Sequence, residues 1–86
     1  MDNLTELPNI GTILAQKLEG IGVSNHEDLA ALGSVEAVVR IGETSSSGCY
    51  NMLCALEGAI QRVRWHSLPQ PIRGELKRQL DAARKN

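Results

Sequence analysis

The sequence predicts an all-α fold, a compact bundle of five or six short helices that forms one domain over residues 1–86. Three observations support this prediction. Apolar residues recur at steps of three or four along nearly the whole chain, which is the period of a helix. GETSSSG at 42–48 is the only cluster of loop-forming residues, and no stretch alternates clearly enough to be a strand. A chain of this length has room for one thin core, built mainly from Leu, Ile and Val because it has only two aromatic residues, Tyr50 and Trp65.

The first helix is expected from about residue 11 to residue 19, because the apolar residues of this stretch fall on one helical face. These residues are Ile10, Leu14, Leu18 and Ile21. Gly20 and Gly22 are expected to end the helix as left-handed caps.

The next segment, HEDLAAL, is expected to be a short helix that ends at Gly33. Its N-cap is either Asn25 or Ser24. Asp28 and Glu27 respectively stand three residues further on, which is the spacing of a capping box.

Ser34 is the expected cap of a third segment, VEAVVRI, in which Val35, Val38 and Val39 form an inward face. A strand is the alternative for this segment, because β-branched residues lower helix propensity.

The longest predicted helix is CYNMLCALEGAIQRVRW at 49–65, the expected central strut of the bundle. Its apolar face consists of Cys49, Met52, Leu53, Leu56, Ile60 and Val63. The two prolines of LPQP at 68–71 must interrupt this helix, since each proline removes a backbone donor and constrains the residue before it.

A last helix is expected after these prolines, with Ile72, Leu76 and Leu80 on one face. Basic residues gather toward its end, where they suit the helix dipole. Residues 81–86 are expected to fray.

The stretch LPNIG at 7–11 resembles the turn of helix-hairpin-helix proteins, which usually reads Leu-Pro-Gly-Ile-Gly and holds a DNA phosphate on its backbone amides. Such a helix start attracts anions because its first N–H groups lack partners. Asn replaces the first glycine here, and Asn tolerates a left-handed backbone better than other non-glycine residues. The helix-hairpin-helix-like element would span about residues 3–20. Its candidate DNA-binding residues are Asn9, Ile10, Gly11, Thr12 and Lys17.

Charge favours an architectural role for this turn over phosphate binding. Residues 1–43 hold two cations against seven anions, a net charge of −5, whereas residues 44–86 hold seven against three, a net charge of +4. DNA-binding members commonly place Pro-Lys or Arg-Lys after the turn, where this chain has Thr12 and Ile13. Contacts to a few phosphates give only weak, salt-sensitive binding. The turn is therefore expected mainly to set the angle between two helices.

A more specific likeness rests on ALEGAIQRVRWHSLP at 55–69, together with LPNIG at 7–11 and GVSNHEDL at 22–29. These motifs resemble the C-terminal domain of the TfoX/Sxy family of bacterial competence regulators, over about 4–80. The resemblance implies a compact helical domain of helix-hairpin-helix or SAM-like type, and a bacterial source. It also implies a role near the transcriptional control of DNA uptake. Fuller members carry an additional N-terminal domain and are thought to act with the cyclic-AMP receptor protein, whereas this chain is expected to be a stand-alone C-terminal domain.

Three features of the second half could serve packing or binding. Gly58 lies inside a predicted helix, at a cost of about 1 kcal/mol relative to Ala, and is expected to permit close approach of another helix. Trp65 is expected to bury its ring under the last helix rather than to stack on a nucleic-acid base. One basic patch is a candidate binding surface, although such a patch is more often a solvated face. Its residues are Arg62, Arg64, Arg73, Lys77 and Arg78.

The sequence carries no recognisable catalytic or metal-binding pattern. It has no nucleophile elbow and no phosphate-binding loop, and His26 and His66 have no carboxylate partner at helical spacing. His66 is best interpreted as a partner of a helix end. Cys49 and Cys54 lie five residues apart on one predicted helix, so they cannot bridge each other and fit a reducing cytoplasm as two partly buried thiols.

The function that the sequence favours is a non-enzymatic binding module. It would bind a protein partner in bacterial transcription or competence regulation, or a second copy of itself, in the cytoplasm, with no cofactor, metal or membrane. The alternative is weak, sequence-independent binding of double-stranded DNA through the turn at 7–11.

Overall fold

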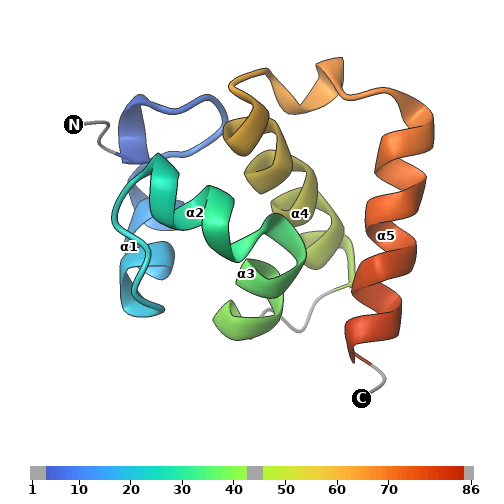
Figure 1. The fold of residues 1–86 in the computed structure, drawn as a ribbon, viewed down its shortest axis with the longest axis horizontal. Helices are drawn as coiled ribbons and strands as arrows, with labels where there is room; N and C mark the ends of the chain where they lie inside the picture. Colours follow the sequence, from blue (N-terminus) through green and yellow to red (C-terminus); the bar gives the residue numbers. More distant parts are fainter. Residues whose placement is uncertain (1–3, 43–45, 85–86) are drawn as a thin grey trace.

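The computed structural model describes residues 4–42 and 46–84. Within these residues every regular element is helical, which confirms the predicted all-α fold, and VEAVVRI is a helix rather than a strand (Figure 1). The elements in chain order are the 3-10 helix η1 (Leu4–Glu6), α1 (Thr12–Gly20), α2 (His26–Leu32), α3 (Ser34–Ile41), α4 (Ser46–Gln61), the 3-10 helix η2 (Trp65–Ser67) and α5 (Gln70–Arg84).

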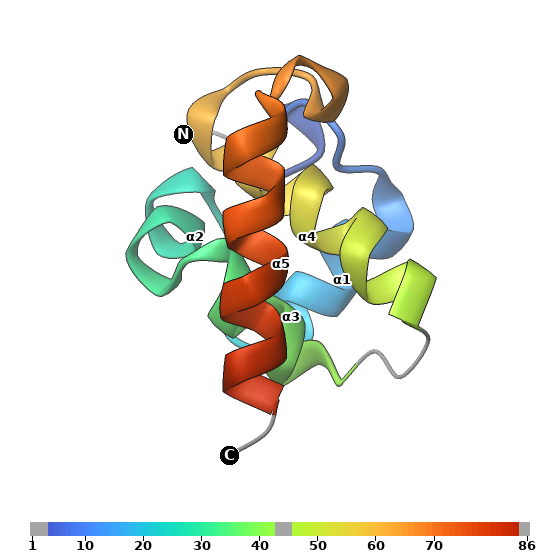
Figure 2. The same cartoon turned by 90° about the vertical axis from the view of Figure 1, so that its right-hand side faces the viewer.

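Helices α3 and α4 form the centre of the bundle. Helix α3 contacts α1, α2, α4 and α5, and α4 also contacts α2, α5 and η2. Helix α5 runs along one side of this pair, and α1 and η1 lie on the opposite side (Figures 1 and 2). The core between them is aliphatic, as expected, and its largest fully buried side chains include Leu18, Leu29, Val38, Leu53 and Leu56.

Helix α1 ends in a Schellman turn, in which one residue takes a left-handed backbone. Gly22 is that residue, with φ +88°. The amide of Val23 donates to the carbonyl of Leu18 at 3.0 Å, and both side chains are buried. The prediction of a left-handed cap is confirmed at Gly22 but wrong at Gly20, which is the last residue of α1 and has no positive φ.

Helix α2 begins as the sequence predicts. Asn25 is its N-cap, and its Oδ1 accepts a hydrogen bond from the amide of Asp28 at 2.8 Å. Asp28 in turn accepts from the amide and hydroxyl of Ser24, so both candidates for the cap take part in the same turn. Gly33 follows the last residue of α2, also as predicted.

The predicted cap and face of the next helix are partly wrong. Ser34 is the first residue of α3 rather than its N-cap, and its buried hydroxyl donates to Glu57 Oε1 on α4 at 2.8 Å. The inward face contains Ala37 and Val38, whereas Val39 is 37% exposed. Val35 is partly buried against the core and Val38 is fully buried, as predicted, so the predicted face is wrong only at Val39, where Ala37 takes the inward position instead.

Helix α4 ends earlier than the apolar period predicts. That period continues to Trp65, but the helix stops at Gln61, and Arg62 takes a left-handed backbone with φ +62°. The amide of Val63 then donates to the carbonyl of Gly58 at 2.8 Å, which closes a second Schellman turn. The chain therefore leaves the axis of α4 before it reaches the tryptophan.

Helix α5 follows the interruption at LPQP, as expected, but it starts at Gln70, between the two prolines rather than after them, and it buries Leu76 and Leu80. Ile72, expected on the same face, is 38% exposed. The helix continues to Arg84, so residues 81–84 of the tail that was expected to fray are helical, and residues 85–86 lie outside the described residues. The loop predicted at 42–48 is shorter than expected, because α4 already begins at Ser46. Residues 43–45 of that loop lie outside the described residues. Of the helices that the structure describes, none is both long enough and apolar enough to cross a bilayer.

Candidate functional site

The LPNIG turn is fastened to the end of α4 by the side chain of Asn9. The backbone of Asn9 is left-handed, with φ +70°, the conformation that the sequence anticipated. Its Nδ2 donates to the carbonyls of Val63 at 3.0 Å and Ala55 at 3.3 Å, and its Oδ1 accepts from the amide of Trp65 at 3.1 Å. One side chain thus holds both the last turns of α4 and the segment that follows it.

Gly58 makes this arrangement possible. A Cβ atom at this position would lie 2.6 Å from Asn9 Nδ2 and 2.8 Å from the carbonyl oxygen of Val63, too close for either atom. The sequence predicted that Gly58 permits close approach of another helix. The approach is real, but it comes from the Asn9 side chain and the turn after α4.

A second side chain ties α2 to the same end of α4. His26 Nε2 lies 2.8 Å from the carbonyl oxygen of Ile60, a distance at which the ring nitrogen donates to the carbonyl. Neither this contact nor the contacts of Asn9 could be inferred from sequence spacing, because each joins residues more than thirty positions apart.

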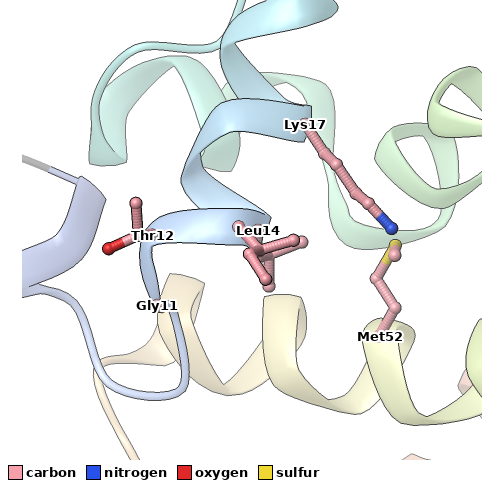
Figure 3. Close-up of a pocket in the computed structure, with 6 residues that line it drawn as sticks. Gly11, Thr12, Leu14, Lys17 and Met52 are labelled. Carbon is pink, nitrogen blue, oxygen red and sulfur yellow. The ribbon is translucent and has the colours of Figure 1, made fainter.

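A largely apolar groove opens between the start of α1 and α4 (Figure 3). We call it the α1 groove; its volume is about 480 Å³ and its lining residues are Gly11, Thr12, Ile13, Leu14, Lys17 and Met52. Ile13 is 71% exposed, the most exposed large apolar side chain in the described part of the chain. Lys17 and Met52 point toward one another across the groove.

Of the five candidate DNA-binding residues, the structure leaves three exposed and uses the other two within the fold. The polar atoms of Asn9 are used in the internal hydrogen bonds described above, and Ile10 is buried. Gly11 and Thr12 are exposed at the start of α1, and the N-cap residue Gly11 supplies no side chain to the first amides of the helix. Lys17 is exposed about one and a half turns further along, at the α1 groove.

A second hollow lies on the other side of the turn, where the chain leaves α4. We call it the Trp65 groove; its volume is about 610 Å³ and its lining residues are Asn9, Asn51, Ala55, Arg64 and Trp65. The prediction that Trp65 is buried under the last helix is wrong, because this residue is 44% exposed. The early end of α4 carries it onto η2, where its ring meets the ring of His66 edge to face, with the centroids 5.6 Å apart.

The predicted basic patch contains two groups of residues. Arg62 and Arg64 follow α4, while Arg73, Lys77 and Arg78 lie on α5. On α5, Arg78 Nε donates to Glu75 at 2.8 Å and Arg73 donates to Gln70 at 2.9 Å. The hydrogen bonds from Arg78, together with one from Gln79, lower the pKa of the Glu75 carboxyl. Of the predicted patch, Arg64 is the member that lines the Trp65 groove.

The two cysteines are unbridged and buried. Burial raises the pKa of the Cys54 thiol, although a hydrogen bond with Tyr50 and the charge of Arg73 act in the opposite direction. Raising the pKa disfavours the reactive thiolate at neutral pH. Across residues 4–42 and 46–84, His, Cys, Asp and Glu side chains form no group of three that could hold a metal ion.

Comparison with known proteins identifies the family. The sequence model of the TfoX C-terminal domain matches residues 1–80. No curated protein matches the chain. Among solved structures, an uncharacterised protein from Listeria monocytogenes in a triclinic crystal form is 45% identical with a TM-score of 0.83, over 95% of this chain and 93% of that one. A Listeria monocytogenes protein of unknown function in a tetragonal form is 46% identical with a TM-score of 0.82, over 94% and 99% of the two chains. This protein therefore belongs to the TfoX C-terminal domain family, as its three sequence motifs indicate.

Proposed function

We propose that this domain is a non-enzymatic protein-binding module and that the α1 groove is its binding surface. The observation that carries the proposal is the position of Ile13, which is 71% exposed at the edge of a groove that also contains Leu14 and Met52. Exposed aliphatic side chains gathered at a concave surface are typical of a site for another protein. Membership of the TfoX C-terminal domain family supports a setting in bacterial transcription or competence regulation.

The occupant that this groove suits best is an apolar face of a helix from a partner protein. Helices bind in grooves through apolar residues spaced by three or four positions, and charged residues at the rim set their direction. Lys17 is the charged residue among those that line the groove, so an acidic residue beside the apolar face would complement it. A second copy of this domain is a different occupant, and light scattering distinguishes it from a partner protein.

The polar side chains around the turn support a binding role rather than catalysis. The side-chain amide of Asn9 and the ring of His26 are both engaged with main-chain carbonyls of α4 or of the segment after it. The Cys54 thiol is buried, and burial raises its pKa. These groups stabilise the fold and do not converge on a common reacting atom.

The test is a comparison of two charge-introducing variants in affinity capture. Tagged wild-type domain, Ile13→Glu and Ile72→Glu are used to capture proteins from a lysate of the source bacterium, and light scattering is recorded for each. Ile72 is the matched control because it is a partly exposed isoleucine on α5, and α5 and α1 lie on opposite sides of the bundle (Figure 1). We expect a specific partner, retained by Ile72→Glu and lost with Ile13→Glu. Equal capture by all three, or a monomer that captures nothing specific, would contradict the proposal.

Weak binding of double-stranded DNA is the second candidate, and it rests on the open start of α1. Gly11 gives the first amides no side-chain cap, and both Gly11 and Thr12 are exposed. Labelled duplex is titrated at about 50 mM salt, where nonspecific phosphate contacts are strongest. Gly11→Asp should abolish binding, whereas Gly74→Asp on α5 should not. Neither glycine has a neighbour within 4 Å of an added Cβ, so both variants should fold.

A further inference from the structure

We propose that the Trp65 groove binds single-stranded nucleic acid, with an unpaired base stacked on the Trp65 indole and a phosphate held by Arg64. Among the described residues, those that line this groove differ from those that line the α1 groove, so this site is separate from the proposed protein-binding surface. The proposal rests on the exposure of the indole, on its rigid support, and on the polar groups beside it.

The indole is presented to solvent on a fixed backbone. Trp65 is 44% exposed, although it has the largest apolar side chain in the sequence. The amide of Trp65 donates to Asn9 Oδ1 at 3.1 Å, and its carbonyl accepts from the amide of Leu68 at 3.1 Å. Because the main chain of Trp65 is already fixed, it loses little conformational freedom when a ligand binds, which favours affinity.

The neighbouring polar groups suit a nucleotide. The side chains of Arg64 and Asn51 line the groove and have no hydrogen-bond or ion-pair partner in the part of the chain that the structure describes. None of the described residues that line this groove is a carboxylate, and residues 44–86 carry seven cations against three anions. A guanidinium can hold a phosphate, an amide can hydrogen-bond a base edge, and an indole can stack on a base.

These groups favour a single strand over the other anionic ligands. In a duplex the bases are already stacked on each other, so an indole has no free base face to meet. An acidic peptide can engage Arg64 and hydrogen-bond the Asn51 amide, but its carboxylate side chains offer the indole no flat ring on which to stack. The volume of about 610 Å³ lies within the usual range of ligand sites.

Intrinsic fluorescence gives a direct test, because Trp65 is the only tryptophan of the chain. An oligothymidylate of about ten nucleotides is titrated into the domain at low salt, since single-strand sites span roughly 4–16 nucleotides. We expect saturable quenching. The same titration with a blunt duplex and with a polyglutamate peptide should leave the fluorescence unchanged. Absence of quenching by oligothymidylate, or equal quenching by either of the other two ligands, would overturn the proposal.

Variants separate the two contacts, with binding followed by the anisotropy of labelled oligothymidylate. Trp65→Leu should weaken binding by about tenfold or more, the usual effect of losing one stacked base, while Trp65→Tyr should retain most of it. The logarithm of the binding constant falls linearly with the logarithm of the salt concentration. Arg64→Gln should reduce the magnitude of that slope by about 0.7, the amount for one phosphate on a single strand. Lys77→Gln, an exposed cation on α5, is the matched control and should change neither quantity. Circular dichroism checks that each variant is folded, and unchanged binding by both Trp65→Leu and Arg64→Gln would disprove the site.

Discussion

The Oδ1 atom of Asn9 accepts a hydrogen bond from the main-chain amide of Trp65, 56 residues further along the chain, at 3.1 Å. The Nδ2 atom of the same side chain donates to the carbonyls of Val63 and Ala55. The resemblance of LPNIG to a phosphate-binding turn suggested an outward-facing role for this stretch. Its asparagine instead faces inward, and fixes where α4 ends and where the tryptophan points.

Removing the Asn9 amide should therefore destabilise the whole domain. Asn9→Ala removes three hydrogen bonds and places an alanine at φ +70°, so we expect a loss of about 2–4 kcal/mol in the free energy of unfolding. Asn9→Gly relieves the backbone and should lose about 1–2 kcal/mol less than Asn9→Ala. Urea denaturation measures both. Asn51→Ala, an exposed amide on α4, is the control, and a loss as small as that of the control would show that Asn9 is not structural.

Gly58 in α4 and Gly74 in α5 should respond in opposite directions to substitution by alanine. Gly58→Ala introduces a Cβ 2.6 Å from Asn9 Nδ2 and should cost about 1–3 kcal/mol through overpacking. Gly74→Ala on α5 meets nothing within 4 Å and should stabilise the domain by about 0.5–1 kcal/mol, because Ala is the better helix former. Thermal and urea unfolding report both changes. Stabilisation by Gly58→Ala would mean that the close approach is absent.

Arg62 occupies a backbone position that favours glycine. Its φ is +62° at the Schellman turn of α4, where a residue with a Cβ atom is strained. Arg62→Gly should therefore be more stable than Arg62→Ala by about 1 kcal/mol, since both variants lose the same side-chain contacts. Equal stability of the two variants in urea denaturation would contradict the left-handed turn.

Glu75 should make stability depend on pH in the acid range. Hydrogen bonds from Arg78 and Gln79 lower the pKa of its carboxyl below the ordinary value of 4.5. The folded state therefore binds this proton less tightly than the unfolded state, so the contribution is present above pH 4.5 and is lost as pH falls through the lowered pKa. NMR titration should give Glu75 a lowered pKa, and Arg78→Gln should raise it. A carboxyl that titrates identically in the two proteins would exclude the ion pair in solution.

Local chemistry made much of the fold predictable. The apolar period located the helices, Asn25 and Gly22 acted as the caps that their types predict, and Gly58 was recognised as a site of close approach. The end of α4 was not predictable in this way. The apolar pattern continues to Trp65, and Arg62 carries no local signal for a left-handed turn. A hydrogen-bond partner 56 residues away helps to decide that helix end, and a pattern within one window contains no information about it.

The candidate site was predictable only in part, for the same reason. The sequence singled out the LPNIG turn, Trp65 and the arginines beside it, but it placed the indole under α5 and treated the arginines as one patch. Each groove is lined by segments distant in sequence, such as Leu14 and Met52 at the α1 groove and Asn9 and Ala55 at the Trp65 groove. Exposure of Ile13 and Trp65 could be seen only once these segments were placed against each other.

The distance along the chain between Asn9 and its three partners, 46 to 56 residues, has a consequence for how the domain folds. A fragment that lacks residues after 54 would leave the asparagine in a strained backbone without any acceptor, and one that lacks the first ten residues would leave the Trp65 amide unpaired. Neither piece holds a complete set of contacts, so the two ends of the molecule should gain and lose their order together, in a single cooperative transition.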